Sequence, residues 1–169
     1  MLIPAAAITL FIQLVDLAGA PPPVVRDAKA AVEEILVDLD MTVEWTQTSD
    51  AVRARPNAIR VTMLPYEGGA LRSHEGAVMG AAARTPLGTG VAWVYYQRVL
   101  EEADHHAVSP ARLLACVIAH EIGHLVLTSP GHEPDGLMRA VWNAADFRRA
   151  SVGRLRFATE SVDRSVVRP

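Results

Sequence analysis

Cysteine is almost absent from the chain: Cys116 is the only one among 169 residues. An intramolecular disulfide is therefore excluded, and the cysteine count alone does not indicate secretion. Cys116 lies in an apolar stretch, four residues before His120. We expect it to be a small buried side chain, as free cysteines commonly are. A thiolate metal ligand is the alternative.

The chain also lacks a strong net charge and an uninterrupted apolar run. The formal net charge is -3 and the sequence pI is ≈ 6.0, so there is no basic field of the kind that attracts nucleic acid. The apolar run at 1–20 is interrupted by Gln13 and Asp16 and is too short for a transmembrane helix. We therefore expect no nucleic-acid partner and no membrane span.

The N-terminal apolar run permits two interpretations. It ends in Ala18, Gly19 and Ala20, as the tail of a secretory signal peptide does, but no lysine or arginine precedes Arg26. Apolar residues also recur at every second position: Ile8, Leu10, Ile12 and Leu14. Because a period of two is typical of a strand, we favour a buried first strand over a signal peptide. The compartment, cytoplasmic or secreted, stays open.

Length and periodicity predict one α+β domain over 1–169. With 50% hydrophobic and 21% charged residues, the chain is long enough for one core and too short for two. Three prolines at 21–23 would start a helix that backs the sheet, and strands are predicted at 41–46, 59–64 and 91–96. A strand, a helix and a strand in this order imply a parallel pair. We expect a twisted, mixed sheet of four to five strands.

The segment 77–84 reads AVMGAAAR and is rich in small residues. Glycine within a strand often marks the close approach of another backbone. One interpretation is an edge strand that binds an extended peptide substrate through main-chain hydrogen bonds, with Gly80 and Ala81 in the substrate pocket. A closely packed inner strand or a plain loop is the alternative.

The stretch from Val117 to Gly131 reads VIAHEIGHLVLTSPG and carries the main functional signal. His120 and His124 are four apart, so on a helix they share one face and can bind one metal ion. Glu121 lies beside the first histidine, where a general base is needed. The flanks are apolar, so the helix, predicted over 110–127, should be buried, and a zinc ion would satisfy its polar residues. A hydrogen-bonded core histidine pair is the alternative.

Two histidines leave a catalytic zinc ion one protein ligand short. The helix is expected to stop in the Ser-Pro-Gly run at 129–131, and this turn would bring His132 back to the same ion. Carboxylates also bind zinc. The alternative third ligands are Glu133, Asp135 and Asp146.

Three other histidines are expected outside the metal site. His74 lies in a glycine-rich connection, where a solvated side chain is favoured over an additional ligand. His105 and His106 are adjacent, and adjacent side chains point in different directions on a helix or a strand. We therefore interpret both as solvated.

Residues 117–138 resemble a known motif. The run HEIGHLVLTSPGH and the following DGLM are similar to the metzincin branch of the zincin metalloproteases, whose zinc motif is HExxHxxGxxH followed by a methionine-containing turn. In particular, the motif resembles that of small bacterial predicted metalloproteases in which the third histidine comes late. By this resemblance Glu121 would be the general base and Met138 the floor of the site. The zinc ligands would be His120, His124 and His132.

The resemblance also implies a fold and a pocket. Residues 1–127 would form the sheet and the active-site helix, and 128–169 a small helical subdomain with the third ligand and the methionine turn. Val141 and Trp142 would form the wall of the pocket for the residue after the scissile bond. The chain departs from the motif at Leu127, where metzincins have glycine, and its third histidine comes late, so the turn at 129–131 must be built differently.

These residues predict zinc-dependent hydrolysis of peptide bonds in a peptide or protein substrate. Zinc lowers the pKa of a bound water from 15.7 towards roughly 7, and Glu121 would take the proton and pass it to the leaving amine. Two alternatives remain: a zinc-bound scaffold that binds peptides without cleaving them, and a zinc hydrolase that acts on a non-peptide amide. The sequence does not indicate the oligomeric state.

Overall fold

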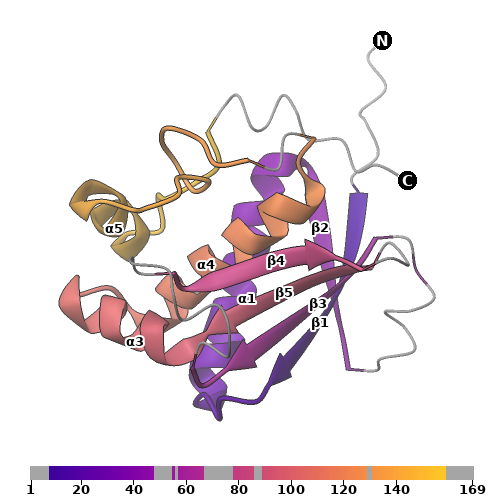
Figure 1. Ribbon diagram of the computed structural model, residues 1–169, viewed down its shortest axis with the longest axis horizontal. Coiled ribbons are helices and arrows are strands. Elements are labelled where there is room, and N and C mark those ends of the chain that lie inside the picture. Colours follow the sequence, from indigo (N-terminus) through magenta and orange to yellow (C-terminus); the bar gives the residue numbers. More distant parts are fainter. Residues whose placement is uncertain are drawn as a thin grey trace.

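The computed structural model describes residues 8–47, 55, 57–66, 78–85, 89–128 and 131–158. They form a mixed five-stranded sheet with helices packed against it (Figure 1). The elements in chain order are β1 (Ile8–Asp16), α1 (Pro22–Leu36), a 3-10 turn η1 (Val37–Leu39), β2 (Met41–Thr46), β3 (Ala58–Leu64), β4 (Gly80–Arg84), β5 (Gly90–Tyr95), α3 (Tyr96–His105), α4 (Pro110–Val126) and α5 (Ala144–Ser151). The predicted α+β class is confirmed at this level.

The sheet has the strand order β2-β1-β3-β5-β4. β1 pairs in parallel with both β2 and β3, and β3 pairs in parallel with β5. Residues 8–16 of the N-terminal apolar run therefore form an interior strand, as their period of two predicts, with Leu10 and Ile12 buried. The parallel pairing of β1 and β2 around α1 is also as predicted.

β4 lies at the edge of the sheet and is antiparallel to β5. It is the small-residue segment for which two interpretations were open, and within the described residues it is an edge strand. Its far end is held on α4, because the Arg84 guanidinium donates a hydrogen bond to the carbonyl of Leu125. This contact places the edge of the sheet beside α4.

α1 and α4 lie side by side behind the sheet (Figure 1). α4 is almost wholly buried, which explains why its sequence is apolar on every side. Pro110 occupies the first helical position, where proline is tolerated, and the Ser109 hydroxyl before it makes no capping hydrogen bond. The helix ends at Val126, and Leu127 has extended backbone angles. Among the described residues, no helix combines the length and apolarity needed to cross a membrane.

A short C-terminal part follows α4. Its described residues form an irregular segment at 131–142 and then α5, where a small helical subdomain was predicted. Asn143 caps α5 in a reciprocal capping box with Asp146. The irregular segment returns the chain to α4, since buried Met138 packs against Gly123 of that helix. An added Cβ at Gly123 would collide with the Met138 sulfur, so the close approach depends on this glycine.

Candidate metal centre

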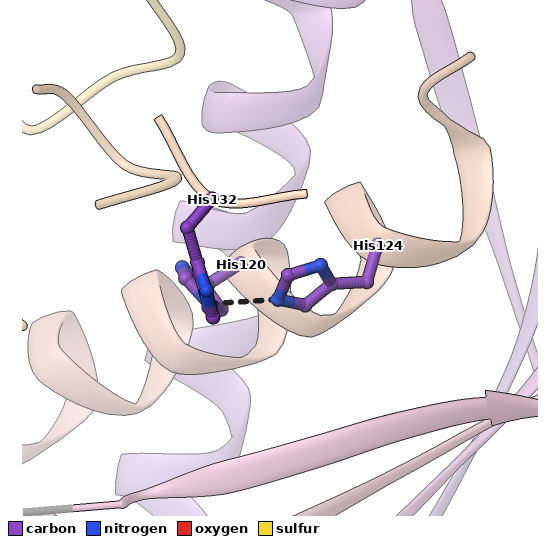
Figure 2. A group of neighbouring side chains, drawn as sticks. All are labelled: His120, His124 and His132. Atoms are coloured by element: carbon purple, nitrogen blue, oxygen red, sulfur yellow. Dashed lines mark hydrogen bonds between the residues drawn. The ribbon is translucent and has the colours of Figure 1, made fainter. Parts of the chain in front are cut away.

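Two histidines face each other on one side of α4. The rings of His120 and His124 lie with centroids 4.7 Å apart and are nearly perpendicular. Their Nε2 atoms are 3.1 Å apart (Figure 2). Two nitrogen ligands of one tetrahedral zinc ion, each about 2.0–2.1 Å from the metal, are about 3.3 Å from each other. The separation therefore fits two ligands of a single ion.

The third histidine comes from the irregular segment beyond α4. The His132 ring centroid lies 4.8 Å from that of His124 and 5.4 Å from that of His120. One nitrogen of each ring belongs to a set whose members all lie within 4.8 Å of one another. Figure 2 shows the three side chains converging from the two segments. A set of three imidazoles can hold a metal ion, and zinc, copper, iron and nickel all accept such ligands.

The carboxylates considered as alternatives are not part of this set. Among the described residues, the three histidines are the group of candidate ligands that converges. Asp146 is engaged elsewhere: it is 1% exposed, caps α5 and pairs with Arg139 and Arg149. Asp135 is exposed, and the Glu133 backbone pairs with Met138 and Arg139.

A backbone carbonyl fixes the orientation of His120. Its Nδ1 lies 2.7 Å from the carbonyl oxygen of Leu137. Because a carbonyl oxygen only accepts hydrogen bonds, Nδ1 carries the proton and the Nε2 lone pair faces the other two histidines. The indole N–H of Trp142 donates to the same oxygen at 3.1 Å. Trp142 thus helps to hold the group that orients His120.

Burial favours the neutral, metal-binding form of the His120 and His132 rings. It lowers the pKa of His120 to about 4, although the Leu137 hydrogen bond opposes the shift. Partial burial of its ring and the neighbouring His124 also lower the pKa of His132, although the residue as a whole is exposed. Neutral imidazole is the metal-binding form, so these histidines are ready to act as ligands at neutral pH.

Glu121 points to the space between α4 and the edge strand. The residue is 5% exposed, and burial raises the pKa of its carboxyl to about 8. An added Cβ at Gly80 would come within 2.6 Å of Glu121 Oε1, so glycine at this point of β4 makes room for the carboxylate. A metal cation nearby would favour the ionised carboxylate and lower this pKa again.

These groups line one cavity of about 500 Å³. Its wall includes the three histidines and Glu121, and every residue that the sequence suggested for a substrate pocket: Gly80, Ala81, Val141 and Trp142. Met138, suggested as the floor, is fully buried against α4. The volume is in the range of about 300–1,000 Å³ that is common for ligand sites.

The interpretation of His106 as solvated was wrong. Its ring stacks on Phe147, with centroids 3.7 Å apart and planes 10° apart, and it lines the cavity. The preceding residue, His105 at the end of α3, is exposed as expected. His74 lies outside the described residues.

The residues of the cavity wall that sequence reasoning missed include Glu102, His106, Arg139 and Phe147. Glu102 and His106 are four apart, a spacing that puts two side chains on one face of a helix. This spacing is the signal in the sequence that could have drawn attention to both residues. Only the tertiary packing of α3 on α4 brings that face to the metal centre.

No family model matches the chain, and no curated protein is similar to it in sequence. Among solved structures, the chain is similar to metalloproteinase-II from Bacteroides fragilis, with a TM-score of 0.51 and 14% sequence identity. The match covers 89% of this chain and 54% of the other, so this chain spans about half of that protein's length. The likeness establishes that this mixed α+β domain shares its fold with a known metalloproteinase.

Proposed function

We propose that the chain is a zinc-dependent metallopeptidase that cleaves peptide bonds within peptide or protein substrates. One observation carries the proposal: three histidine nitrogens converge within 4.8 Å, and a buried glutamate lines the same cavity. The fold shared with a metalloproteinase supports it. In this proposal His120, His124 and His132 hold the ion, and Met138 supports them from below.

The proposed reaction gives separate roles to the metal ion, to Glu121 and to the Leu137 carbonyl. When bound, the metal ion would supply Lewis acidity to the attacking water and to the peptide carbonyl. Glu121 would accept the proton of that water and then deliver it to the leaving amine. Its buried position excludes bulk water, which keeps the proton at the site until the amine departs. The Leu137 carbonyl would hold His120 in the correct tautomer throughout.

The edge strand supplies a place for an extended substrate. A peptide that adds to β4 would receive main-chain hydrogen bonds, and the small side chains of Gly80 and Ala81 leave it room. Gly80 also lies against the Glu121 side chain in the folded structure. A peptide on this strand would therefore pass the general base and the histidines.

The two alternative functions, a non-cleaving scaffold and a hydrolase of non-peptide amides, each leave one feature of the site unexplained. A non-cleaving scaffold has no use for a buried glutamate beside the metal ligands, because burying an ionisable group without a role is costly. A hydrolase of small non-peptide amides shares every proposed ligand but needs no edge strand beside the base. The position of β4 at the edge of the sheet therefore favours a peptide substrate.

Metal analysis combined with a cleavage assay tests the proposal. The purified protein is analysed for metal by mass spectrometry and incubated with a mixed peptide library, with and without a chelator. We expect one zinc ion per chain and cleavage that stops with chelator and returns when zinc is restored. One zinc ion with no cleavage of any peptide would favour the scaffold, and cleavage that persists in the metal-free protein would refute the mechanism.

A further inference from the structure

The cavity continues beyond the metal centre along a row of aromatic rings. The Trp142 ring lies 5.9 Å from that of His120, and the Phe147 ring lies 6.1 Å from that of Trp142. His106 then stacks on Phe147 at 3.7 Å. All four rings line the cavity. The row leads from the proposed ligands to the part of the cavity that α3 covers.

An acidic group closes this part of the cavity. Glu102 of α3 lines the wall, and its Oε2 lies 3.4 Å from Nε2 of His106. The Glu102 side chain is only 21% exposed. The contact with His106 involves the carboxylate oxygen Oε2. As an acidic side chain in the wall, Glu102 would give this part of the cavity a negative charge that attracts a cation.

The cation in the same wall does not balance that charge. The Arg139 guanidinium donates to the Pro134 carbonyl through both Nε and Nη2. Its third nitrogen, Nη1, lies 3.3 Å from Asp146, which is 1% exposed. Arg139 is thus held by a carbonyl and a buried carboxylate of the C-terminal part, whereas Glu102 belongs to α3.

We propose that this part of the cavity selects substrates with a lysine or arginine side chain next to the scissile bond. The aliphatic stem of such a side chain would lie along Trp142 and Phe147, and its cation would reach Glu102. The inference rests on the proposed peptidase function and adds the chemical class of its substrate. Glu102 is the specificity-determining residue in this proposal.

Matched peptides test the selection. A set of otherwise identical peptides carries Lys, Arg, norleucine or Glu on either side of the cleaved bond, and kcat/KM is measured for each. For the wild type we expect the Lys and Arg peptides to be cleaved about tenfold faster or more than the norleucine peptide, as a charge-assisted hydrogen bond predicts. Glu102→Gln should remove this advantage, so that the Lys and Arg peptides are cleaved no faster than the norleucine peptide.

Glu101→Gln is the matched control. It removes the same charge from the same helix, but Glu101 is half exposed and pairs with Arg98. This variant should retain the preference. Glu102→Lys extends the test, because reversing the charge should move the preference to the Glu peptide. A wild type that prefers norleucine or Glu, or a Glu102→Gln variant that slows all peptides equally, would overturn the proposal.

A binding measurement separates this inference from the function on which it rests. The zinc-loaded Glu121→Gln protein is titrated with the same peptides, so that affinity is measured without cleavage. Tighter binding of the Lys and Arg peptides, lost in Glu102→Gln, supports the cationic pocket even if the wild type cleaves nothing. Equal binding of all four peptides contradicts the pocket, whatever the wild type cleaves.

Discussion

The candidate metal centre has two halves that are built in different ways. The helical half is His120, Glu121 and His124 on α4, a helix that is buried over nearly its whole length. The loop half is the irregular segment 131–142, which contributes His132, Met138 and Trp142. In the first half, helical geometry alone sets the spacing of the side chains. In the second, individual hydrogen bonds and one glycine contact hold the chain in place.

The two halves differ in how strongly the rest of the protein holds them in place. Glu121 and His120 are at most 9% exposed, whereas His132 is an exposed residue. The loop half reaches α4 mainly through Met138 beneath Gly123 and through the shared acceptor Leu137. Substitutions in the helical half should therefore abolish catalytic activity. Substitutions in the loop half should lower the metal affinity by amounts that differ from residue to residue.

The largest expected effect lies in the helical half. Glu121→Gln should lower kcat by about 10²–10⁴-fold, the usual contribution of a general base, while the protein keeps its metal ion. His120→Ala should lose both the metal and the activity. Steady-state rates and metal content by mass spectrometry check the pair. Turnover by Glu121→Gln at the wild-type rate would remove Glu121 from the mechanism.

The next effect concerns the third ligand. His132→Ala should weaken metal binding by more than about 100-fold, because loss of an outer-shell partner already costs 10–100-fold. Competition with a chromogenic chelator measures the affinity. Glu133→Gln and Asp135→Asn are the controls and should bind the metal as the wild type does. If one of them loses the metal and His132→Ala does not, the third ligand is a carboxylate.

The contact between the halves can be broken directly. Gly123→Ala places a methyl group where the Met138 sulfur lies and should destabilise the protein by about 1–3 kcal/mol, as overpacking does. Urea unfolding of the metal-free protein measures the free energy of unfolding. The double variant Gly123→Ala, Met138→Ala should be destabilised by less than the sum of the two single variants, because the shorter side chain makes room for the methyl group. Additive effects would mean that the contact is unimportant.

Burial of Glu121 predicts a pH dependence for the metal-free protein. The pKa of this carboxyl is about 8 in the folded chain, against an ordinary value of 4.5. Between these values the folded state holds a proton that the unfolded state has released, so stability falls as the pH rises. From pH 6.5 to 8 the loss should be about 2 kcal/mol. Glu121→Gln should remove it, and an unchanged slope would contradict the burial of this carboxyl.

His120 gives the opposite slope at lower pH. Its pKa is lowered from 6.5 to about 4, so its contribution to stability is lost as the pH falls through this window. The two slopes oppose each other between pH 4.5 and 6.5. For this reason the range above pH 6.5 is the cleaner test of Glu121.

The smallest effect is expected from one hydrogen bond in the loop half. Trp142→Phe keeps an aromatic ring but removes the N–H that holds the Leu137 carbonyl. Metal affinity should fall about tenfold, the lower end of the range for an outer-shell partner. Trp45→Phe is the matched control, because that indole donates to Glu33 far along the sheet. Equal affinities for both variants would mean that His120 does not depend on Trp142.

The same division explains how far the sequence could be interpreted. Periodicity was enough for β1, β2 and α4, because alternation and helical spacing are local properties. The side chains on α4 followed from that helix. The hydrogen bond from Trp142 to Leu137 and the stacking of His106 on Phe147 could not be predicted, because they join segments whose relative position only tertiary packing decides. Gly80 drew attention through composition, but its proximity to Glu121 is a tertiary fact.

One measurement tests the convergence of the two halves most directly. A crystal structure of the zinc-loaded protein, with anomalous diffraction recorded on both sides of the zinc edge, locates the ion without assuming its ligands. We predict one anomalous peak per chain, about 2.0–2.1 Å from a ring nitrogen of each of His120, His124 and His132. An ion bound elsewhere, or bound by the two helical histidines with His132 turned away, would contradict the proposed centre.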